Sequence, residues 1–506
     1  MPSNNSSTGA LSAPKESVSS DSSTSPRTTG RGRWSPRLVG VGLVVLCVVG
    51  IFLSPTAAVA GGFVIALMLV LLFMGLPVGI ALALASLIGI YALSGIPATI
   101  NILSVAPYNA VSSWALSVLP MFIFMGMLLT ASGMTTKIYR VTDQWFGWLP
   151  GGIGIGTTAA GAGLSSVSGS TIGMTYALGR AGIPEMLKAG YDRRIAVGTV
   201  IVAGLPGNLI PPSILLVVYA GIANVPVGPQ LIAGTVPGIL IALMFAIFIF
   251  FFSMLAPNLF GRNNKGHQKR QAVSWHERFT SLLDIWGFPV IMFVLFGGMF
   301  SGVFTPTEAG AAAAFIALVL CLWYKRADRP LATVGRAAVS TVSATAAIFF
   351  LLIGAEMLTR VLAITGLAEL MTSFITGLGL SRIAFLCVLL ALYLVMGMFF
   401  DTLSMMLLTI PVLMPTLETM GIDALWFGVF VIILGELAMI TPPVGVLSYI
   451  VHNMTKSKEV NVGHAISLKD VFTSLLWFLP VAIIFIFVLI AFPDIVTWLP
   501  NILTSG

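Results

Sequence analysis

The chain has 506 residues, of which 57% are hydrophobic and 8% are charged, and its formal net charge is +7. Soluble domains carry roughly 25% charged residues, so this composition excludes a soluble globular protein and indicates a membrane protein. The long apolar runs do not alternate with polar residues, which excludes a membrane β-barrel. Because one helical crossing needs ~20 apolar residues, we expect an all-α polytopic protein with on the order of a dozen crossings and some shorter re-entrant pieces.

The N-terminal segment differs from the rest of the chain in composition. Residues 1–36 are rich in Ser, Thr, Pro and Gly, so we expect a disordered cytoplasmic tail. The apolar run that follows predicts an additional N-terminal transmembrane helix over 37–56. The Ala-Val-Ala of residues 58–60 imitates a signal-peptidase site, but the long polar leader favours an anchored helix. The main membrane core is expected over 61–498, and its first two apolar runs are separated at 75–77.

Two blocks of this core, about 114–254 and about 343–454, repeat one another at an offset of 231 residues. The matching residues interrupt membrane helices, whereas Leu and Val would match by chance in so apolar a chain. The pairs are Ser170 and Asp401, Thr171 and Thr402, Met174 and Met405, Pro184 and Pro415, Gly190 and Gly421, Asp192 and Asp423, Gly204 and Gly435, and the double prolines at 211–212 and 442–443. Such paired, interrupted segments predict the binding site of a secondary transporter.

Charge placement predicts the orientation of the two blocks. The loop at 180–194 contains four Lys and Arg residues, whereas its counterpart at 411–425 contains none. By the positive-inside rule the two loops face opposite sides, so we expect inverted repeats whose centres lie near the membrane midplane. The other basic clusters are Arg31, Arg33 and Arg37; Arg262, Lys265, Lys269, Arg270 and Arg278; and Lys325, Arg326, Arg329 and Arg336. We interpret the cluster at 262–278 as a topology signal rather than a nucleic-acid site.

The first candidate site is the Ser-Ser-Val-Ser-Gly-Ser-Thr stretch at 165–171. In lipid, unwound backbone survives only where it is buried in protein or lines a watery cavity. Hydroxyl and carbonyl oxygens are also suitable ligands for a hard cation. Close helix packing, which favours small residues too, is the alternative interpretation.

The second candidate is Asp401 with Thr402, at the matching place in the second block. An ionisable residue at membrane depth costs at least ~2.5 kcal/mol on insertion scales, so we single out Asp401 as a functional carboxylate. It also suits a helix N-cap, and the two roles are compatible in a broken helix. Three other acidic residues are not assigned to a site. Glu308 fits a helix start, Glu356 fits an ion pair with Arg360, and Glu436 could bind a cation, carry a proton or pair with a distant Lys.

The double prolines close the elements that begin at Gly204 and Gly435. Each proline removes a backbone donor and frees the carbonyl four residues earlier. Freed carbonyls are what Na⁺ sites in secondary transporters use, although a structural kink is the alternative.

Several kinds of chemistry have no sequence signal. The sequence contains no Walker-type phosphate loop, and its four histidines show no metal-ligand spacing. No nucleophile or general base accompanies a plausible cofactor site, so we do not expect an enzyme. Cys47, Cys321 and Cys387 lie in apolar runs, where they pack as small hydrophobes.

In combination, the motifs resemble the large membrane subunit of tripartite ATP-independent periplasmic (TRAP) transporters over about 61–498. The residues that carry the resemblance are Ser168-Gly169-Ser170, Ile183-Pro184-Glu185-Met186-Leu187, Gly190-Tyr191-Asp192-Arg193, Ile210-Pro211-Pro212-Ser213, Phe304-Thr305-Pro306-Thr307-Glu308-Ala309 and Thr441-Pro442-Pro443-Val444-Gly445. The resemblance implies a multi-pass protein of the bacterial inner membrane with two re-entrant hairpins, broken helices and an elevator mechanism. It also implies Na⁺-driven uptake of an organic acid such as a dicarboxylate or sialic acid, with a small membrane subunit and a periplasmic substrate-binding protein as partners.

The same resemblance implies about two Na⁺ sites, with the substrate between the hairpin tips. The first Na⁺ site would use Ser168, Ser170 and carbonyls near Gly204, Gly207 and Pro212, and the second Asp401, Thr402 and carbonyls near Gly435 and Thr441. Substrate contacts would come from Ser168, Gly169, Ser170, Asn208, Asp401 and Thr402. The sequence departs from the family pattern at Pro206-Gly207-Asn208 and Met439-Ile440. A stand-alone carrier of the same superfamily, which works without a binding protein, is the alternative.

Overall fold

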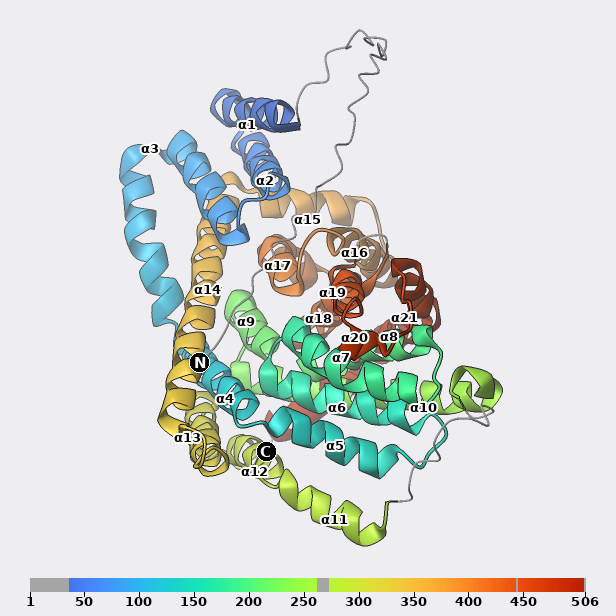
Figure 1. The fold of residues 1–506 in the computed structure, drawn as a ribbon. Coiled ribbons are helices and arrows are strands. Elements are labelled where there is room, and N and C mark those ends of the chain that lie inside the picture. The colour runs from blue at the N-terminus through green and yellow to red at the C-terminus, as the bar shows by residue number, and fades with distance from the viewer. Residues whose placement is uncertain (1–35, 262–272, 443–444, 505–506) are drawn as a thin grey trace, which may run out of the picture.

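The computed structural model describes residues 36–261, 273–442 and 445–504, and within these ranges every regular element is a helix (Figure 1). Seven of the described helices are long and apolar enough to cross a membrane, or eight spans if the bent pair α11 (Trp275–Asp284) and α12 (Gly287–Phe300) counts as one. Five shorter apolar helices accompany them. Residues 1–35 of the tail expected over 1–36 lie outside the described residues, and Pro36 is the first residue of α1. The basic residues Arg262, Lys265, Lys269 and Arg270, and Pro443 and Val444, lie outside them too.

The chain enters the membrane core through three helices. The additional helix expected over 37–56 corresponds to α1 (Pro36–Leu53), which packs on α2 (Ala57–Phe73). The break expected at 75–77 is present, since α3 (Val78–Ser112) begins after Pro77. Gly95, at φ +73°, bends α3 in its middle, and α3 packs along α14 (Pro330–Thr365).

The first block folds into η1 (Trp114–Leu116), α4 (Val118–Ala131), α5 (Met134–Phe146), α6 (Gly152–Ser168), α7 (Thr171–Lys188), α8 (Arg193–Ala203), η2 (Pro206–Asn208), α9 (Ile214–Ala223) and α10 (Val227–Leu255). The second block consists of the end of α14, then α15 (Leu367–Gly377), α16 (Arg382–Met396), α17 (Thr402–Thr419), α18 (Ala424–Ile440) and α19 (Val446–Met454). The blocks are linked by η3 (Pro257–Leu259), α11, α12, α13 (Pro306–Tyr324) and the start of α14, and α20 (Lys458–Asn461), α21 (Leu468–Ala491) and α22 (Asp494–Thr504) close the chain.

Helices α5 to α9 of the first block and α15 to α19 of the second follow one another in the same order, and α15, α16 and α17 lie above α5, α6 and α7 in Figure 1. Helices α7 and α17 are both 18 residues long, and the offset of 231 relates their first and last residues. Both are capped by a side chain, since Ser170 accepts a hydrogen bond from the Gly173 amide and Asp401 accepts one from the Ser404 amide. The correspondence therefore extends from helix lengths to individual caps.

The turns that follow α7 and α17 also correspond. Gly190 and Gly421 both have positive φ, at +84° and +63°, a conformation that costs glycine little. The next helices, α8 and α18, both begin at an aspartate cap, Asp192 and Asp423. Local sequence thus determines where both helical pairs turn.

Two local contacts agree with the sequence analysis. Thr305 and Glu308 form a reciprocal capping box at the start of α13, in agreement with the expected helix start. Glu356 and Arg360, which lie on the part of α14 inside the second block, form an ion pair at 3.2 Å. The chain bends by 60° between α11 and α12.

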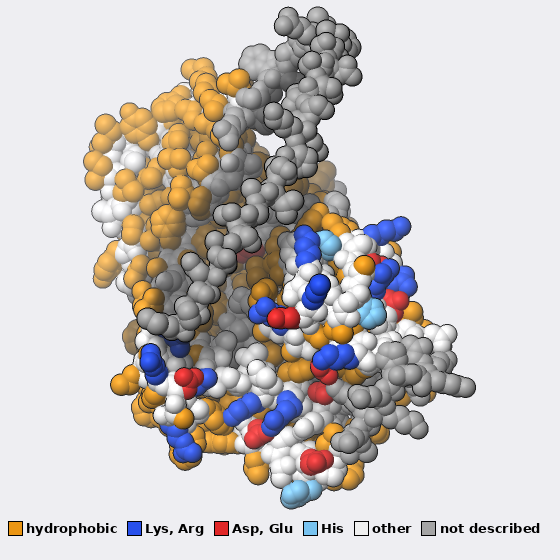
Figure 2. Space-filling view, viewed as in Figure 1, with side chains coloured by type: hydrophobic (Ala, Val, Ile, Leu, Met, Phe, Trp, Pro, Cys, Tyr) orange, Lys and Arg blue, Asp and Glu red, His pale blue; other side chains and the backbone are white. Residues whose placement is uncertain are grey.

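Helices α8 and α18 form the centre of the molecule. All side chains from Ile195 to Ala203 and from Trp426 to Ile440 are buried. Large hydrophobic side chains are exposed on outer helices such as α1, α3 and α10. Figure 2 shows these side chains over α1, α2 and α3, whereas Lys, Arg, Asp and Glu gather on the lower part of the same face. This division separates a lipid-facing surface from an aqueous one.

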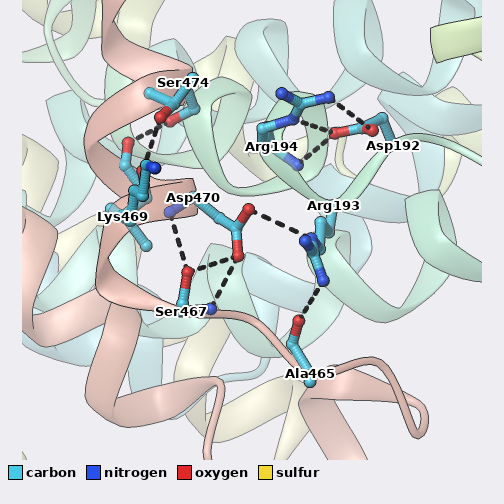
Figure 3. A network of polar contacts seen from close by, with 10 residues as sticks. Asp192, Arg193, Arg194, Ala465, Ser467, Lys469, Asp470 and Ser474 are labelled. Carbon is cyan, nitrogen blue, oxygen red and sulfur yellow. Dashed lines mark hydrogen bonds and ion pairs between the residues drawn. The ribbon is translucent and has the colours of Figure 1, made fainter.

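A polar network joins the start of α8 to the start of α21 (Figure 3). Arg193 pairs with Asp470 at 3.2 Å and donates to the Ala465 carbonyl at 2.7 Å. Arg194 pairs with Asp192 at 3.0 Å, and the Arg194 guanidinium lies 5.3 Å from the Trp477 ring centroid. The basic loop of the first repeat is thereby fixed to the start of α21.

Candidate functional site

A cavity of about 150 Å³ lies where the first turns of α7 and α17 meet. We call residues 168–172 tip one and residues 399–403 tip two, since they precede and open these two helices. The cavity is lined by Gly169, Ser170, Thr171 and Ile172 of tip one, by Asp401, Thr402 and Leu403 of tip two, and by Asn208, Leu215, Glu436 and Met439. The structure therefore brings together residues that are more than two hundred positions apart in the sequence.

Tip one is shaped by a left-handed glycine. Gly169 ends α6 at φ +61°, and a Cβ there would meet Ile214 Cδ1 at 2.4 Å, so only glycine fits this turn. The Ser168 hydroxyl lies 3.4 Å from both the amide and the carbonyl of Ser170. Ser170 is exposed and its hydroxyl caps α7, which leaves oxygen atoms at the edge of the cavity.

Tip two presents a carboxylate at the corresponding position. Asp401 caps α17 through the Ser404 amide at 3.4 Å and also accepts a hydrogen bond from the Ser404 hydroxyl. Asp401 itself is exposed, whereas Thr402 is buried beside it. The cap that the sequence suggested for Asp401 is thus present on a residue that also lines the cavity.

Glu436 of α18 connects the two tips. Its side chain is only 1% exposed. The Thr171 hydroxyl donates to Glu436 Oε2 at 2.9 Å, and the Thr402 hydroxyl donates to Glu436 Oε1 at 3.0 Å. Thr171 and Thr402 are related by the repeat offset, whereas the counterpart of Glu436 is Leu205. Sequence reasoning did not assign Glu436 to the site, although a lone carboxylate opposite a leucine in an aligned repeat was an available signal.

Asn208 extends this network into the first repeat. Its amide nitrogen donates to the Thr171 hydroxyl, and its Oδ1 accepts from the Ser165 hydroxyl at 3.0 Å. The Ser213 hydroxyl donates to the Asn208 carbonyl. Buried polar groups need such partners, so this network fixes the orientation of Asn208 toward the cavity.

Ser168 is not among the residues that line the cavity, and neither are the predicted carbonyl ligands Gly204, Gly207, Pro212, Gly435 and Thr441. Two of them allow close helix contacts, because a Cβ at Gly204 would meet Met174 Cε at 2.2 Å and one at Gly435 would meet Thr402 Cγ2 at 2.5 Å.

Gly207, Pro212 and Thr441 also have specific local contacts or backbone geometry. A Cβ at Gly207 would meet Ser165 Cβ at 2.3 Å, and Pro212 follows a cis peptide bond. Helix α18 continues through Gly435 to Ile440, and the hydroxyl of Thr441 donates to the Leu437 carbonyl at 2.7 Å.

The arrangement combines features that attract both signs of charge. Two helix N-termini open into one cavity, and the partial positive charge of their free amides favours an anion. Two carboxylates, Asp401 and Glu436, and the hydroxyls of Ser170, Thr171 and Thr402 line the same space and favour a hard cation. A small anion and a cation could thus be bound next to each other.

Comparisons with known proteins agree on one family. Residues 65–495 match the family model described as "Tripartite ATP-independent periplasmic transporter, DctM component". The chain is 29% identical over 456 residues to the C4-dicarboxylate TRAP transporter large permease protein DctM of Vibrio cholerae, which covers 86% of this chain and 96% of that protein. It is 30% identical to the ectoine TRAP transporter large permease protein TeaC of Halomonas elongata, which covers 75% and 87% of the two chains.

A solved structure shows the same fold. The YdaH transporter of Alcanivorax borkumensis superposes with a TM-score of 0.59 over 79% of this chain and 90% of that chain, at 13% identity.

The sialic acid TRAP transporter permease protein SiaT of Haemophilus influenzae is 27% identical over 86% of this chain and 67% of its own length. The chain therefore belongs to the DctM family of TRAP transporter large permeases, and it is a multi-pass protein of the bacterial inner membrane rather than an enzyme.

Proposed function

We propose that the chain is the large transmembrane subunit of a TRAP transporter that takes up an organic acid anion with Na⁺ as the coupling ion. The observation that supports this proposal is the cavity in which two repeat-related helix N-termini meet two carboxylates. Uptake of an anion together with cations requires both kinds of group in one place.

The residues present fit Na⁺. Asp401 and Thr402 offer a carboxylate and a hydroxyl at tip two, and Ser168 and Ser170 offer hydroxyls at tip one. Carbonyls near Gly204, Gly207, Pro212, Gly435 and Thr441 would complete the two sites. When bound, Na⁺ would supply the positive charge that offsets Asp401 and attracts the anionic solute.

The proposed solute is a small carboxylate-bearing molecule. The named relatives transport a C4-dicarboxylate, sialic acid or ectoine, and all three of these compounds carry a carboxylate. A cavity of about 150 Å³ accepts the carboxylate end of such a molecule beside the α7 and α17 N-termini. Ser168, Gly169, Ser170, Asn208, Asp401 and Thr402 are the proposed contacts.

The proposed transporter works with partners. A small membrane subunit would cover part of the apolar outer helices, and a periplasmic substrate-binding protein would deliver the solute. One relative is named as an isethionate TRAP transporter permease protein DctMQ, and this chain covers 59% of its length. Movement of the two repeats and their tips as an elevator would carry the cavity across the bilayer.

Reconstitution into liposomes tests the proposal. We expect solute uptake only when the small subunit, the binding protein and an inward Na⁺ gradient are all present. D401N should abolish Na⁺-dependent uptake, because the carboxylate at tip two is lost. D423N is the matched control, since Asp423 caps α18 outside the cavity. Unchanged uptake by D401N would contradict the Na⁺ site, and uptake by this chain alone would favour the stand-alone carrier.

A further inference from the structure

One carboxylate from the second repeat serves both tips. Glu436 Oε2 accepts the Thr171 hydroxyl at 2.9 Å and Glu436 Oε1 accepts the Thr402 hydroxyl at 3.0 Å, so each oxygen holds one tip. A carboxylate with two such contacts resists independent movement of α7 and α17, whose first residues are these two threonines. The contact therefore crosses the boundary between the repeats at the first residues of α7 and α17.

The packing around the two threonines is the same in both repeats. A Cβ at Gly204 would meet Thr171 Cγ2 at 3.2 Å, and a Cβ at Gly435 would meet Thr402 Cγ2 at 2.5 Å. The methyl group of each threonine thus packs against the equivalent glycine of its own repeat. At the next position the repeats differ, since Leu205 stands opposite Glu436. The carboxylate that joins the two threonines therefore comes from the second repeat alone.

We propose that Glu436 is a positioning residue that ties tip one to tip two, so that the ordering of one tip by its cation also orders the other. This inference rests on the proposed Na⁺ coupling, and it gives a physical reason for solute uptake to depend cooperatively on the Na⁺ concentration. A residue that biases two sites at once couples their affinities by about 5-fold to 150-fold in typical cases. The tie acts through Thr171 and Thr402, so Glu436 needs no contact with the solute.

The first test is E436Q, measured by solute uptake into liposomes that contain the full transporter. Glutamine keeps the shape but has one acceptor oxygen, so one of the two hydroxyls loses its acceptor. We expect the dependence of uptake on Na⁺ concentration to lose its steepness and the half-saturating Na⁺ concentration to rise about 5-fold or more. An unchanged Na⁺ curve, or a lost maximal rate with an unchanged curve, would overturn the proposal.

A distance measurement separates this inference from the proposed function. Spin labels at Y176C on α7 and E418C on α17, in a chain whose Cys47, Cys321 and Cys387 are replaced by alanine, report how the two helices sit relative to each other. We expect a narrow distance distribution with Glu436 and a broader one with E436Q, in the absence of Na⁺. If wild-type uptake does not depend on the Na⁺ concentration, only the proposed Na⁺ coupling is contradicted. If the distance distributions of the wild type and E436Q are equal, the proposed link between the two tips through Glu436 is contradicted.

Discussion

At the scale of single residues, Gly435 determines how closely α18 approaches tip two. A Cβ at Gly435 would lie 2.5 Å from Thr402 Cγ2, closer than side chains normally come, whereas a Cβ at Gly62 on α2 would meet nothing within 4 Å. The two glycines therefore form a matched pair, one in a packed contact and one in open space.

We expect G435A to lower the free energy of unfolding by about 1–3 kcal/mol, because the added methyl overpacks the contact with α17. G62A should leave it unchanged or slightly raised, since alanine favours a helix over glycine. Thermal unfolding in detergent, followed by circular dichroism, compares the two variants. Equal thermal unfolding midpoints for G435A and G62A would show that α17 moves away from the added methyl group without a loss of stability.

The sequence predicted some residues of the cavity better than others. Ser170 and Asp401 were found because small and ionisable residues at the same register of two repeats are rare in an apolar chain. Glu436 was not assigned, since its direction depends on how α18 packs between α7 and α17, and no local pattern encodes that packing. The hydroxyls of Thr171 and Thr402 became meaningful only when their shared acceptor was located.

At the scale of helices, the turn after each tip helix relies on a left-handed residue. Gly421 ends the α17 turn at φ +63°, and nothing lies within 4 Å of an added Cβ. Any cost of substitution there comes from the backbone conformation alone, since no steric contact is involved.

We expect G421A to destabilise the protein by about 1–2 kcal/mol, the usual cost of a left-handed conformation for a residue with a Cβ. G421N should cost less, because asparagine enters this region more readily. Thermal midpoints of the two variants measure the difference. Equal effects of Ala and Asn would mean that the turn changes conformation instead.

Helix boundaries with a chemical signal were predicted, and those without one were not. The break before Val78 and the capping box of Thr305 and Glu308 follow from glycine, proline and cap residues in the sequence. Helix α14 begins at Pro330 and runs without interruption past residue 343, where the second block is expected to begin. Nothing in that stretch marks a boundary, because the helix is continued by packing along α3.

At the scale of the whole molecule, the inverted arrangement of the repeats can be tested directly. Lys188 and Thr419 are the last residues of α7 and α17, they are equivalent by the offset, and both are exposed. The loops that follow these residues differ in charge, so the sequence predicts that the two residues lie on opposite sides of the membrane.

In a chain without native cysteines, we expect a membrane-impermeant thiol reagent added to intact cells to label T419C but not K188C. Both should react after the membrane is made permeable, which controls for reactivity. Labelling of both positions in intact cells would contradict the inverted orientation. The network of Arg193 and Asp470 near Lys188 would then have to face the periplasm.

The sequence predicted the overall architecture better than it predicted the long-range contacts between elements. Composition and the repeat offset predicted an all-α membrane protein with two matched blocks, and the family comparison agrees. The link from Arg193 to Asp470, by contrast, joins residues 277 positions apart that no repeat relates. Long-range pairs of this kind arise only when the chain is folded.

The single carboxylate of Glu436 also has a consequence for how the duplicated halves can change over evolutionary time. Each half contains its own caps, turns and glycines. At the tips, however, the hydroxyl of Thr171 donates to a carboxylate of the other half. A substitution at Glu436 therefore alters the first residue of a helix in each half, so the two halves cannot vary independently at this point.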